Sequence, residues 1–217
     1  MRVALLFLAI PTALAAAPPP KEPETAKLKR LWGETIDLDK DCTFALDGDK
    51  LKIGVPNKSH LYRATSHDGG RGQPDNAPRT EQKVSGDFTL TVQLTQTRPA
   101  TDKENAGSFA GAGVYILGGA GCCSVSLHHT AGSDGAVNNS QFRLTGKTTH
   151  SSTSGARGTS KDEATKPIAL RLVREGNQIK TTYSTDGKTW KTMWNYDGEF
   201  AHDVTVGVYA ENTGAKG

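Results

Sequence analysis

The stretch that decides the fold runs from residue 86 to residue 94 and reads Gly-Asp-Phe-Thr-Leu-Thr-Val-Gln-Leu. After the Gly-Asp turn, the apolar residues Phe88, Leu90, Val92 and Leu94 alternate with threonine and glutamine. Alternation with a period of two places the apolar side chains on one face of a strand and the polar side chains on the other. The stretch therefore predicts a strand of an antiparallel sheet, with one face in a core and the other in water.

The same alternation recurs along most of the chain. It is found in residues 51–55, 125–127, 142–144, 168–172, 179–183 and 204–208, and turns such as Asp47-Gly48, Asp186-Gly187 and Asp197-Gly198 separate the segments. Asp-Gly supplies the positive φ of tight hairpins. About ten to twelve short strands predict an all-β chain, a two-sheet antiparallel jelly-roll sandwich. The polar stretch 146–166 predicts an exposed loop.

Composition narrows the class of protein. The chain has 217 residues, 26 Lys and Arg against 23 Asp and Glu, and a formal net charge of +3. This length suits one domain with its own core. No block of Lys or Arg forms a basic footprint, so we expect no nucleic-acid partner.

The N-terminus predicts export. Residues 1–15 read as a signal peptide: Arg2 is followed by an apolar run, and Ala13-Leu14-Ala15 is a small-x-small cleavage site. An N-terminal membrane anchor is the alternative, but a span needs about 20 apolar residues and Pro11 interrupts the run. We expect a Pro-rich extended leader over residues 16–29, a domain over residues 30–217, no membrane span, and a secreted or periplasmic location.

The chain has three cysteines, Cys42, Cys122 and Cys123. In an oxidising compartment an odd number predicts one bridge and one remaining thiol. Adjacent strand residues point to opposite faces, so we expect Cys42 to pair with only one of the other two. A bridge between the adjacent cysteines and three free thiols are the alternatives. No Cys-x-x-Cys spacing or histidine set completes a four-ligand site, so no metal is expected.

The order of these segments resembles a known family. The resemblance rests on residues 49–53, 84–92, 110–116, 170–177, 183–190 and 206–210 and covers roughly Trp32 to Asn212. In this order the chain resembles the concanavalin A-like lectin/glucanase sandwiches, and among them the uncharacterised family named after a regulation-of-enolase protein. The resemblance implies a jelly roll that occurs alone or joined to secreted carbohydrate-active proteins. It supplies no mechanism.

One hairpin is similar to a second pattern. Residues 184–190, Ser-Thr-Asp-Gly-Lys-Thr-Trp, are one residue shorter than the Asp-box hairpin of sialidase-type propellers. A single copy does not support a propeller. We expect a structural role, in which Asp186 accepts hydrogen bonds from turn amides and Trp190 packs beneath.

The acidic residues do not predict a hydrolase. Glycoside hydrolysis needs two carboxylates facing each other across a cleft. The lectin-like glucanases carry them as Glu-x-Asp-x-x-Glu on one strand, and this chain has no such run. His128 and His129 point to opposite faces of a strand and cannot hold one metal together. We expect no catalytic residue and no cofactor; a structural Ca²⁺ is conceivable, although we see no spaced Asp or Asn ligand loop.

A binding face is the remaining hypothesis. If the apolar residues of neighbouring strands face the core, a row of polar and aromatic side chains faces outward and could line a concave sheet. Rings stack on sugars and forked polar groups bind hydroxyls. The candidates are Tyr115, His128, Arg143 and Arg171, with Trp194 and Tyr196 as a stacking platform at one rim.

The predicted function is that of an exported, non-catalytic recognition domain that binds glycan or cell-surface polysaccharide. The alternatives are a divergent glycoside hydrolase-like enzyme and a structural module of the cell envelope. An ordinary solvent-facing sheet would explain the same row of residues without a ligand.

Overall fold

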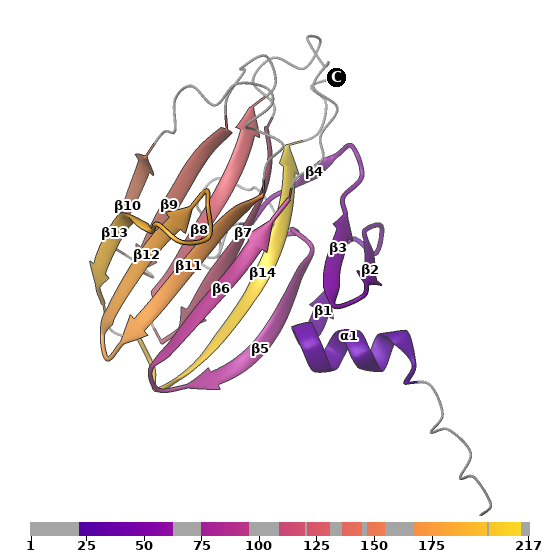
Figure 1. The fold of residues 1–217 in the computed structure, drawn as a ribbon, viewed down its shortest axis with the longest axis horizontal. Helices are drawn as coiled ribbons and strands as arrows, with labels where there is room; N and C mark the ends of the chain where they lie inside the picture. Colours follow the sequence, from indigo (N-terminus) through magenta and orange to yellow (C-terminus); the bar gives the residue numbers. More distant parts are fainter. Residues whose placement is uncertain are drawn as a thin grey trace, which may run out of the picture.

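The structure is a computed structural model that describes residues 22–62, 75–95, 109–119, 121–130, 136–144, 147–154, 167–198 and 200–213. Two antiparallel sheets pack face to face (Figure 1). The larger sheet has eight strands and the smaller has four. The sandwich predicted by the alternating pattern is thus observed.

The larger sheet runs in the order β1 (Glu34–Ile36), β5 (Arg79–Ser85), β14 (Asp203–Thr213), β7 (Phe109–Gly118), β8 (Gly121–Thr130), β9 (Ala136–Leu144) and β10 (Lys147–Ser154). A short strand, β4 (Ser59–His60), also pairs with β14. The predicted loop over residues 146–166 is therefore wrong for its first part, because residues 147–154 form β10 at the edge of the sheet. Threonine, abundant in this stretch, is β-branched and suits an edge strand that is polar on both faces.

The smaller sheet runs in the order β13 (Lys191–Asp197), β12 (Gln178–Ser184), β11 (Ile168–Glu175) and β6 (Phe88–Leu94). Strand β6 is the stretch that predicted the fold, and it lies at the sheet edge, where Val92 pairs with Leu170 and Leu90 with Leu172. The core lies between the sheets. Leu170 and Leu172 from one sheet and Val114 and Val125 from the other are fully buried there.

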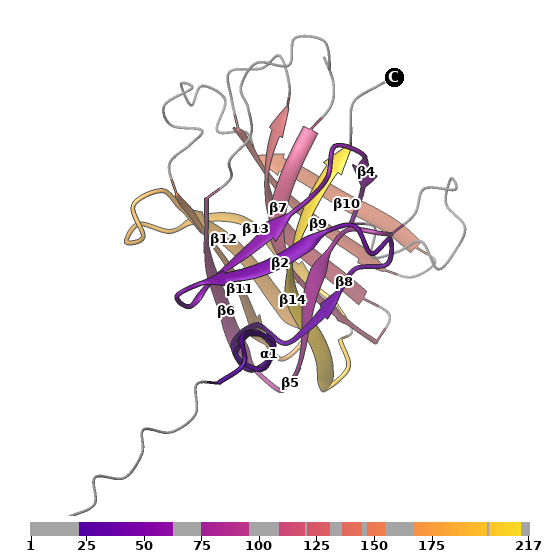
Figure 2. The same ribbon diagram turned by 90° about the vertical axis from the view of Figure 1, so that its right-hand side faces the viewer.

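The N-terminal part closes one side of the sandwich (Figure 2). Helix α1 (Glu24–Trp32) packs beside a separate hairpin formed by β2 (Thr43–Asp47) and β3 (Lys50–Gly54). Among the described residues α1 is the one α-helix, and at nine residues it is too short to cross a membrane.

The helix corrects the predicted leader. Residues 24–29 were expected to be extended, yet they form most of α1. Glu24 in the first turn and Arg30 in the last turn complement the helix dipole. Leu28 is buried, and Trp32 packs against the core while its Nε1 donates to the carbonyl of Asp49 at 3.0 Å. The segment therefore buries apolar side chains, which we did not expect from its prolines and charged residues. The predicted signal peptide, residues 1–15, lies outside the described residues, and the domain boundary near Arg30 stays a prediction.

Candidate functional site

The candidate site lies on the face of the larger sheet that is turned away from the smaller sheet. Val114, Val125 and Val208 point into the core, so Tyr115, Ser126 and Tyr209 point to the other face. We call this cluster the tyrosine face; its members are Tyr62, Tyr115, Ser126, His128, Tyr209 and Glu211.

Glycines on the central strands make room for these side chains. Tyr115 on β7 reaches across Gly207 on β14, and its hydroxyl donates to the carbonyl of Thr80 on β5 at 3.1 Å. A Cβ at Gly207 would overlap that carbonyl. Gly111 on β7 likewise lies between β8 and β14, under the contact between His128 and Glu211. Without a Cβ at these positions, side chains on non-adjacent strands meet across the strand between them.

Three tyrosine rings gather on this face. Tyr62, two residues after β4, stacks on Tyr209 with ring centroids 4.2 Å apart and meets Tyr115 in a tilted contact at 4.8 Å. Tyr115 and Tyr209 are buried beneath, while Tyr62 is half-buried. Burial raises the pKa of each of the three phenols above its usual value. The hydroxyls therefore stay neutral and can donate hydrogen bonds.

A polar pair lies next to the rings. His128 Nε2 is 2.7 Å from Glu211 Oε1 and 2.9 Å from the hydroxyl of Ser126. The other carboxylate oxygen of Glu211, Oε2, accepts from the amide of Tyr62 at 3.3 Å. The side chain of Glu211 is 6% exposed and that of His128 is 16% exposed. The pair is thus held in one geometry with one edge in contact with solvent.

The structure divides the six predicted site residues between the two sheets. Tyr115 and His128 lie on the tyrosine face, as the outward row predicted, but Tyr115 is fully buried. The backbone register places Arg143 on β9 opposite Cys122, one strand farther along; its side chain lies outside the described residues. The tyrosines that sequence reasoning missed are Tyr62 and Tyr209, and the alternation in 204–208 could have identified the second.

The other three predicted residues belong to the smaller sheet, so the expected single row is wrong. Arg171 lies on β11, with its guanidinium 3.5 Å from the centroid of the Trp190 ring. Trp194 on β13 is 42% exposed. Tyr196 is buried in the core, where it cannot serve as an exposed platform. Alternation within one strand could not predict which sheet each strand joins.

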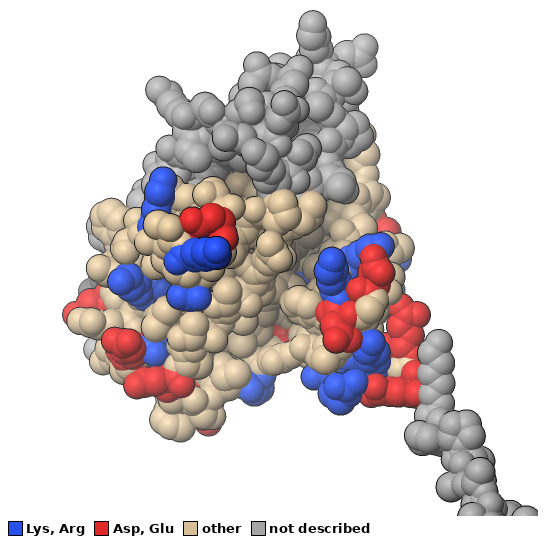
Figure 3. All heavy atoms as spheres, viewed as in Figure 1, with Lys and Arg blue, Asp and Glu red and all other residues tan. Residues whose placement is uncertain are grey.

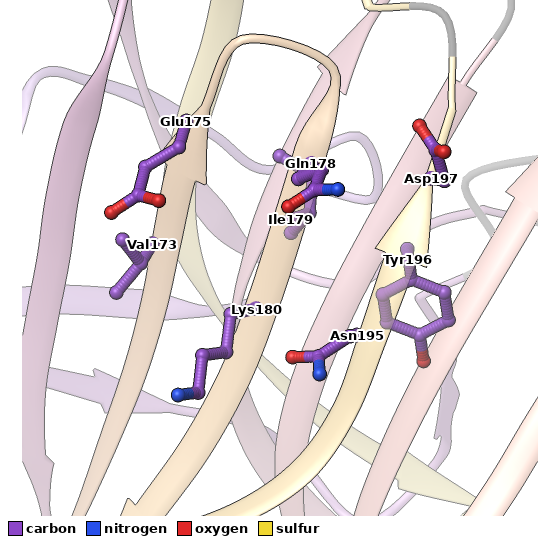
Figure 4. A pocket seen from close by; sticks show the side chains of 8 residues that line it. All are labelled: Val173, Glu175, Gln178, Ile179, Lys180, Asn195, Tyr196 and Asp197. Atoms are coloured by element: carbon purple, nitrogen blue, oxygen red, sulfur yellow. The ribbon is translucent and has the colours of Figure 1, made fainter.

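A cavity of about 420 Å³ lies at one end of the smaller sheet. Its polar lining comes from Glu175, Gln178, Lys180, Asn195 and Asp197, and Figure 4 shows Gln178 between the two carboxylates. Both acids are exposed, and register places their backbones two strands apart, about 9–10 Å. They neither face each other nor lie in the sheltered setting of a glycosidase acid.

The tyrosine face also lacks an opposed acid pair among the described residues. A second carboxylate on this face is that of Glu81 on β5. The register of β5 and β14 places Glu81 opposite Gly207, and Gly207 lies four positions before Glu211 on β14. That separation is about 13 Å along the strand, wider than either glycosidase geometry. Glu81 is also paired with Arg79 at 2.9 Å.

The cysteines differ from the expected pairing. All three are free thiols: Cys42 lies in the loop before β2, next to Asp41, and the Cys122 sulfur is 3.7 Å from the hydroxyl of Tyr62. Cys122 and Cys123 point to opposite faces of β8, as expected. The predicted bridge from Cys42 is not formed. Cys42 lies beside Asp41 in the loop before β2, whereas Cys122 lies beside Tyr62 on the outer face of the larger sheet.

The structure brings together three side chains with metal-ligating atoms that the sequence did not single out as a set. Asp41, Cys42 and His60 bring one ligand atom each to within 4.8 Å of one another. The sequence signal was the run Asp-Leu-Asp-Lys-Asp-Cys at residues 37–42, which sequence reasoning passed over. The histidine comes from β4, 18 residues after Cys42, and spacing alone could not place it there.

The hairpin at residues 184–190 has the expected structural role. The Asp186 carboxylate accepts from the amides of Lys188 and Thr189 at 2.8 and 2.7 Å and from the Ser184 hydroxyl at 2.9 Å. These bonds, the Thr189 amide first, hold the pKa of Asp186 well below its usual range. The turn is stabilised by charge-assisted hydrogen bonds and offers no reactive group.

Charges are mixed on the face shown in Figure 3. Lys and Arg side chains lie beside Asp and Glu over α1, over the β2–β3 hairpin and over the smaller sheet. Pairs such as Lys27 with Asp49 at 2.9 Å and Arg30 with Glu22 at 2.8 Å join opposite signs. This described face carries no large area of a single sign.

Comparisons with known proteins bear on the fold. No family model matches the chain, and no curated protein is significantly similar to it. A functionally unknown protein from Saccharomyces cerevisiae is similar in structure, with a TM-score of 0.62 at 15% identity over 84% of this chain and 88% of that chain. The CBM2 module of the Lactobacillus casei BL23 phage J-1 evolved Dit has a TM-score of 0.54 at 6% identity, covering 80% of this chain and 72% of that one.

A legume lectin-like domain from Entamoeba histolytica is more distant, with a TM-score of 0.40 at 10% identity over 64% of this chain and 72% of that chain. Such identities show a shared fold and no shared activity. The narrower resemblance to the family named after a regulation-of-enolase protein stays a prediction. The chain has a two-sheet antiparallel sandwich, a fold that it shares with the yeast protein and the CBM2 module.

Proposed function

We propose that this chain is a non-catalytic recognition domain that binds carbohydrate at the tyrosine face. One observation carries the proposal: the half-buried Tyr62 ring lies next to the partly exposed edge of the His128–Glu211 pair. A ring and a fixed polar pair side by side match a sugar, whose faces are apolar and whose rim carries hydroxyls.

The register of the larger sheet supports this choice. The backbone of β9 pairs with β8 at Ser124 and Ser126, so β9 continues the larger sheet next to the tyrosine face. The similarity to a CBM2 module is consistent with a binding role and does not specify a ligand. Export remains part of the proposal and rests on residues 1–15.

The two alternatives have less support in the described part of the chain. A hydrolase would need two opposed carboxylates, and the acids on both faces are too far apart or turned away from each other. An envelope scaffold would need a contiguous apolar patch of several hundred Å². Among the described residues the exposed large apolar side chains are Leu38, Leu117 and Trp194, which lie in the loop after β1, on β7 and on β13.

The test is binding to an array of plant, algal and bacterial polysaccharides, followed by affinity electrophoresis with each polysaccharide that binds. Tyr62→Ala removes the stacking ring, and Glu211→Gln removes the charge that orients His128. We expect each change to weaken binding about 10-fold or more, since hydrogen bonds to charged groups contribute about 1.5–3 kcal/mol.

Matched variants on the other sheet distinguish the faces. Tyr183→Ala and Glu175→Gln make the same chemical changes on β12 and β11, and we expect them to leave binding unchanged. Binding lost with Glu175→Gln but kept with Glu211→Gln would place the site in the cavity of the smaller sheet, and binding lost with Trp194→Ala alone would place it elsewhere on that sheet. No binding to any polysaccharide would overturn the recognition proposal itself.

A further inference from the structure

The inference concerns the loop between β1 and β2 and its contact with β4. Asp37 shapes this loop: its carboxylate accepts from the amides of Lys40 and Cys42 at 3.0 and 2.9 Å. Lys40 adopts a φ of 58°, which few residues other than glycine occupy. The turn brings Asp39, Asp41 and Cys42 against His60 of β4.

The distances between the ligand atoms fit a single small cation. His60 Nε2 lies 2.9 Å from Asp41 Oδ1 and 3.6 Å from Asp39 Oδ2, and Cys42 Sγ lies 3.5 Å from Asp41 Oδ1. The edges of a tetrahedron of oxygen, nitrogen and sulfur ligands around Zn²⁺ are about 3.2–3.7 Å long. Asp41, Cys42 and His60 therefore bring three donor atoms to within 4.8 Å of one another, and Asp39 lies beside His60 as the candidate fourth ligand.

The hydrogen bonding of His60 indicates what these atoms hold. Its Nδ1 lies 3.2 Å from the carbonyl oxygen of Lys58, an atom that only accepts hydrogen bonds. Nε2 then faces Asp41 Oδ1, another atom that only accepts, from a ring that is 0% exposed. Two acceptors at this distance need a second proton or a metal ion between them. A carbonyl on the outer ring nitrogen is also how metal-bound histidines are oriented.

Charge and supporting contacts agree with a divalent ion. Without a metal, burial and the neighbouring carboxylates of Asp37 and Asp41 raise the pKa of the Cys42 thiol to about 12. With a metal bound, Asp39, Asp41 and the thiolate of Cys42 would contribute three negative charges, and Lys58, paired with Asp41 Oδ2, contributes one positive charge. The net charge of these four groups is then −2, which one divalent cation balances. The cation displaces the thiol proton of Cys42 as it binds. Asn76, which is buried, donates to Asp39 Oδ2 at 2.7 Å and to the carbonyl of Ser59 at 3.0 Å, and so joins the loop to β4.

We propose that Asp39, Asp41, Cys42 and His60 form a structural binding site for Zn²⁺ or a similar borderline metal ion. A thiol and an imidazole beside two carboxylates favour such ions over Ca²⁺, which takes six to eight oxygen ligands. The site would fasten the N-terminal loop to β4 and, through it, to β14 of the larger sheet. This inference does not depend on carbohydrate binding.

The test uses the untagged full chain, freed of metal with a chelator and titrated with Zn²⁺ and with Co²⁺ as a spectroscopic probe. We expect Co²⁺ to produce the intense visible bands of tetrahedral coordination together with a thiolate-to-cobalt charge-transfer band. Zn²⁺ at 100 times its Kd should raise the stability by about 2.7 kcal/mol, seen as a higher Tm.

Conservative variants assign the ligands. Cys42→Ser should remove the charge-transfer band, and Asp41→Asn should weaken Zn²⁺ binding about 100-fold or more, beyond the effect of a supporting residue. His202→Ala removes an exposed histidine outside the site, and Cys122→Ser removes another thiol; both should bind as the unaltered chain does.

Three results would overturn the proposal. One is octahedral Co²⁺ without a thiolate band in the unaltered chain, and another is Zn²⁺ binding that survives both Cys42→Ser and Asp41→Asn. The third is a Tm raised by Ca²⁺ and unaffected by Zn²⁺. Binding of no metal at all would overturn the proposal as well, and the cluster would then be a hydrogen-bonded group of the loop and β4. Because Asp41→Asn keeps the shape of the side chain, a folded variant is expected even where His60→Ala fails to fold.

Discussion

Gly111 shows how single residues shape the tyrosine face. A Cβ atom there would lie 2.5 Å from His128 Cδ2 and 3.1 Å from Glu211 Cγ. Gly111→Ala should therefore push the pair apart and destabilise the fold by about 1–3 kcal/mol, the usual cost of overpacking. Urea denaturation measures the change.

A double-mutant cycle checks the cause of that loss. In a chain that already carries His128→Ala, the new methyl group meets space instead of a ring, so Gly111→Ala should cost less there. An equal cost in both backgrounds would show that the clash with His128 is not the reason.

Asp186 is a second single residue that stabilises the fold, and the stability that its carboxylate contributes depends on pH. Its pKa is lower in the folded chain than in the unfolded chain, chiefly because the Thr189 amide donates to it. The stability that it contributes is complete above about pH 5 and is lost as the pH falls below about 4. The difference in urea midpoint between the unaltered chain and Asp186→Asn should therefore narrow in acid. Asp197→Asn, which removes a carboxylate outside this turn, is the matched control.

At the scale of elements, α1 and the β2–β3 hairpin depend on a few apolar contacts with the sandwich. Leu28 of α1 is 7% exposed, whereas Leu38, in the loop after β1, is 60% exposed. Leu28→Ala should lower the free energy of unfolding by about 2–3 kcal/mol, since it leaves a cavity. Leu38→Ala should change it by less than about 0.5 kcal/mol. Similar losses for the two variants in thermal or urea unfolding would mean that α1 does not pack on the sandwich.

Across the whole molecule, the two sheets share one core. Leu172 of β11 and Leu127 of β8 belong to the same cluster of buried residues. Leu172→Ala and Leu127→Ala should each lower the free energy of unfolding by about 2–5 kcal/mol. Each variant should still unfold in a single transition, at a lower midpoint than the unaltered chain. In a Trp32→Phe background, tryptophan fluorescence reports on the smaller sheet through Trp190 and Trp194, and far-UV circular dichroism reports on all strands. Their midpoints should coincide in both variants; separate midpoints would mean that the sheets unfold independently.

The sequence by itself determined the strands, most turns and the sandwich. Alternation such as that of residues 86–94 records which face of a strand is buried, and Asp-Gly pairs mark tight turns. The same logic identified the outward side of β7 and β8 and the capping role of Asp186. These features are local, because they depend on residues a few positions apart.

Only the tertiary structure decided which strands share a sheet and which side chains meet. Tyr62 and Tyr209 are 147 positions apart in the sequence, and they stack because β4 and β14 are neighbours. In the sequence, Arg171 and His128 are both polar residues on the outward side of an alternating strand, yet their strands belong to different sheets. The Asp41–Cys42–His60 cluster likewise forms by loop closure. A period of two reveals the face of a strand but carries no information about its partners, which depend on packing across the whole chain.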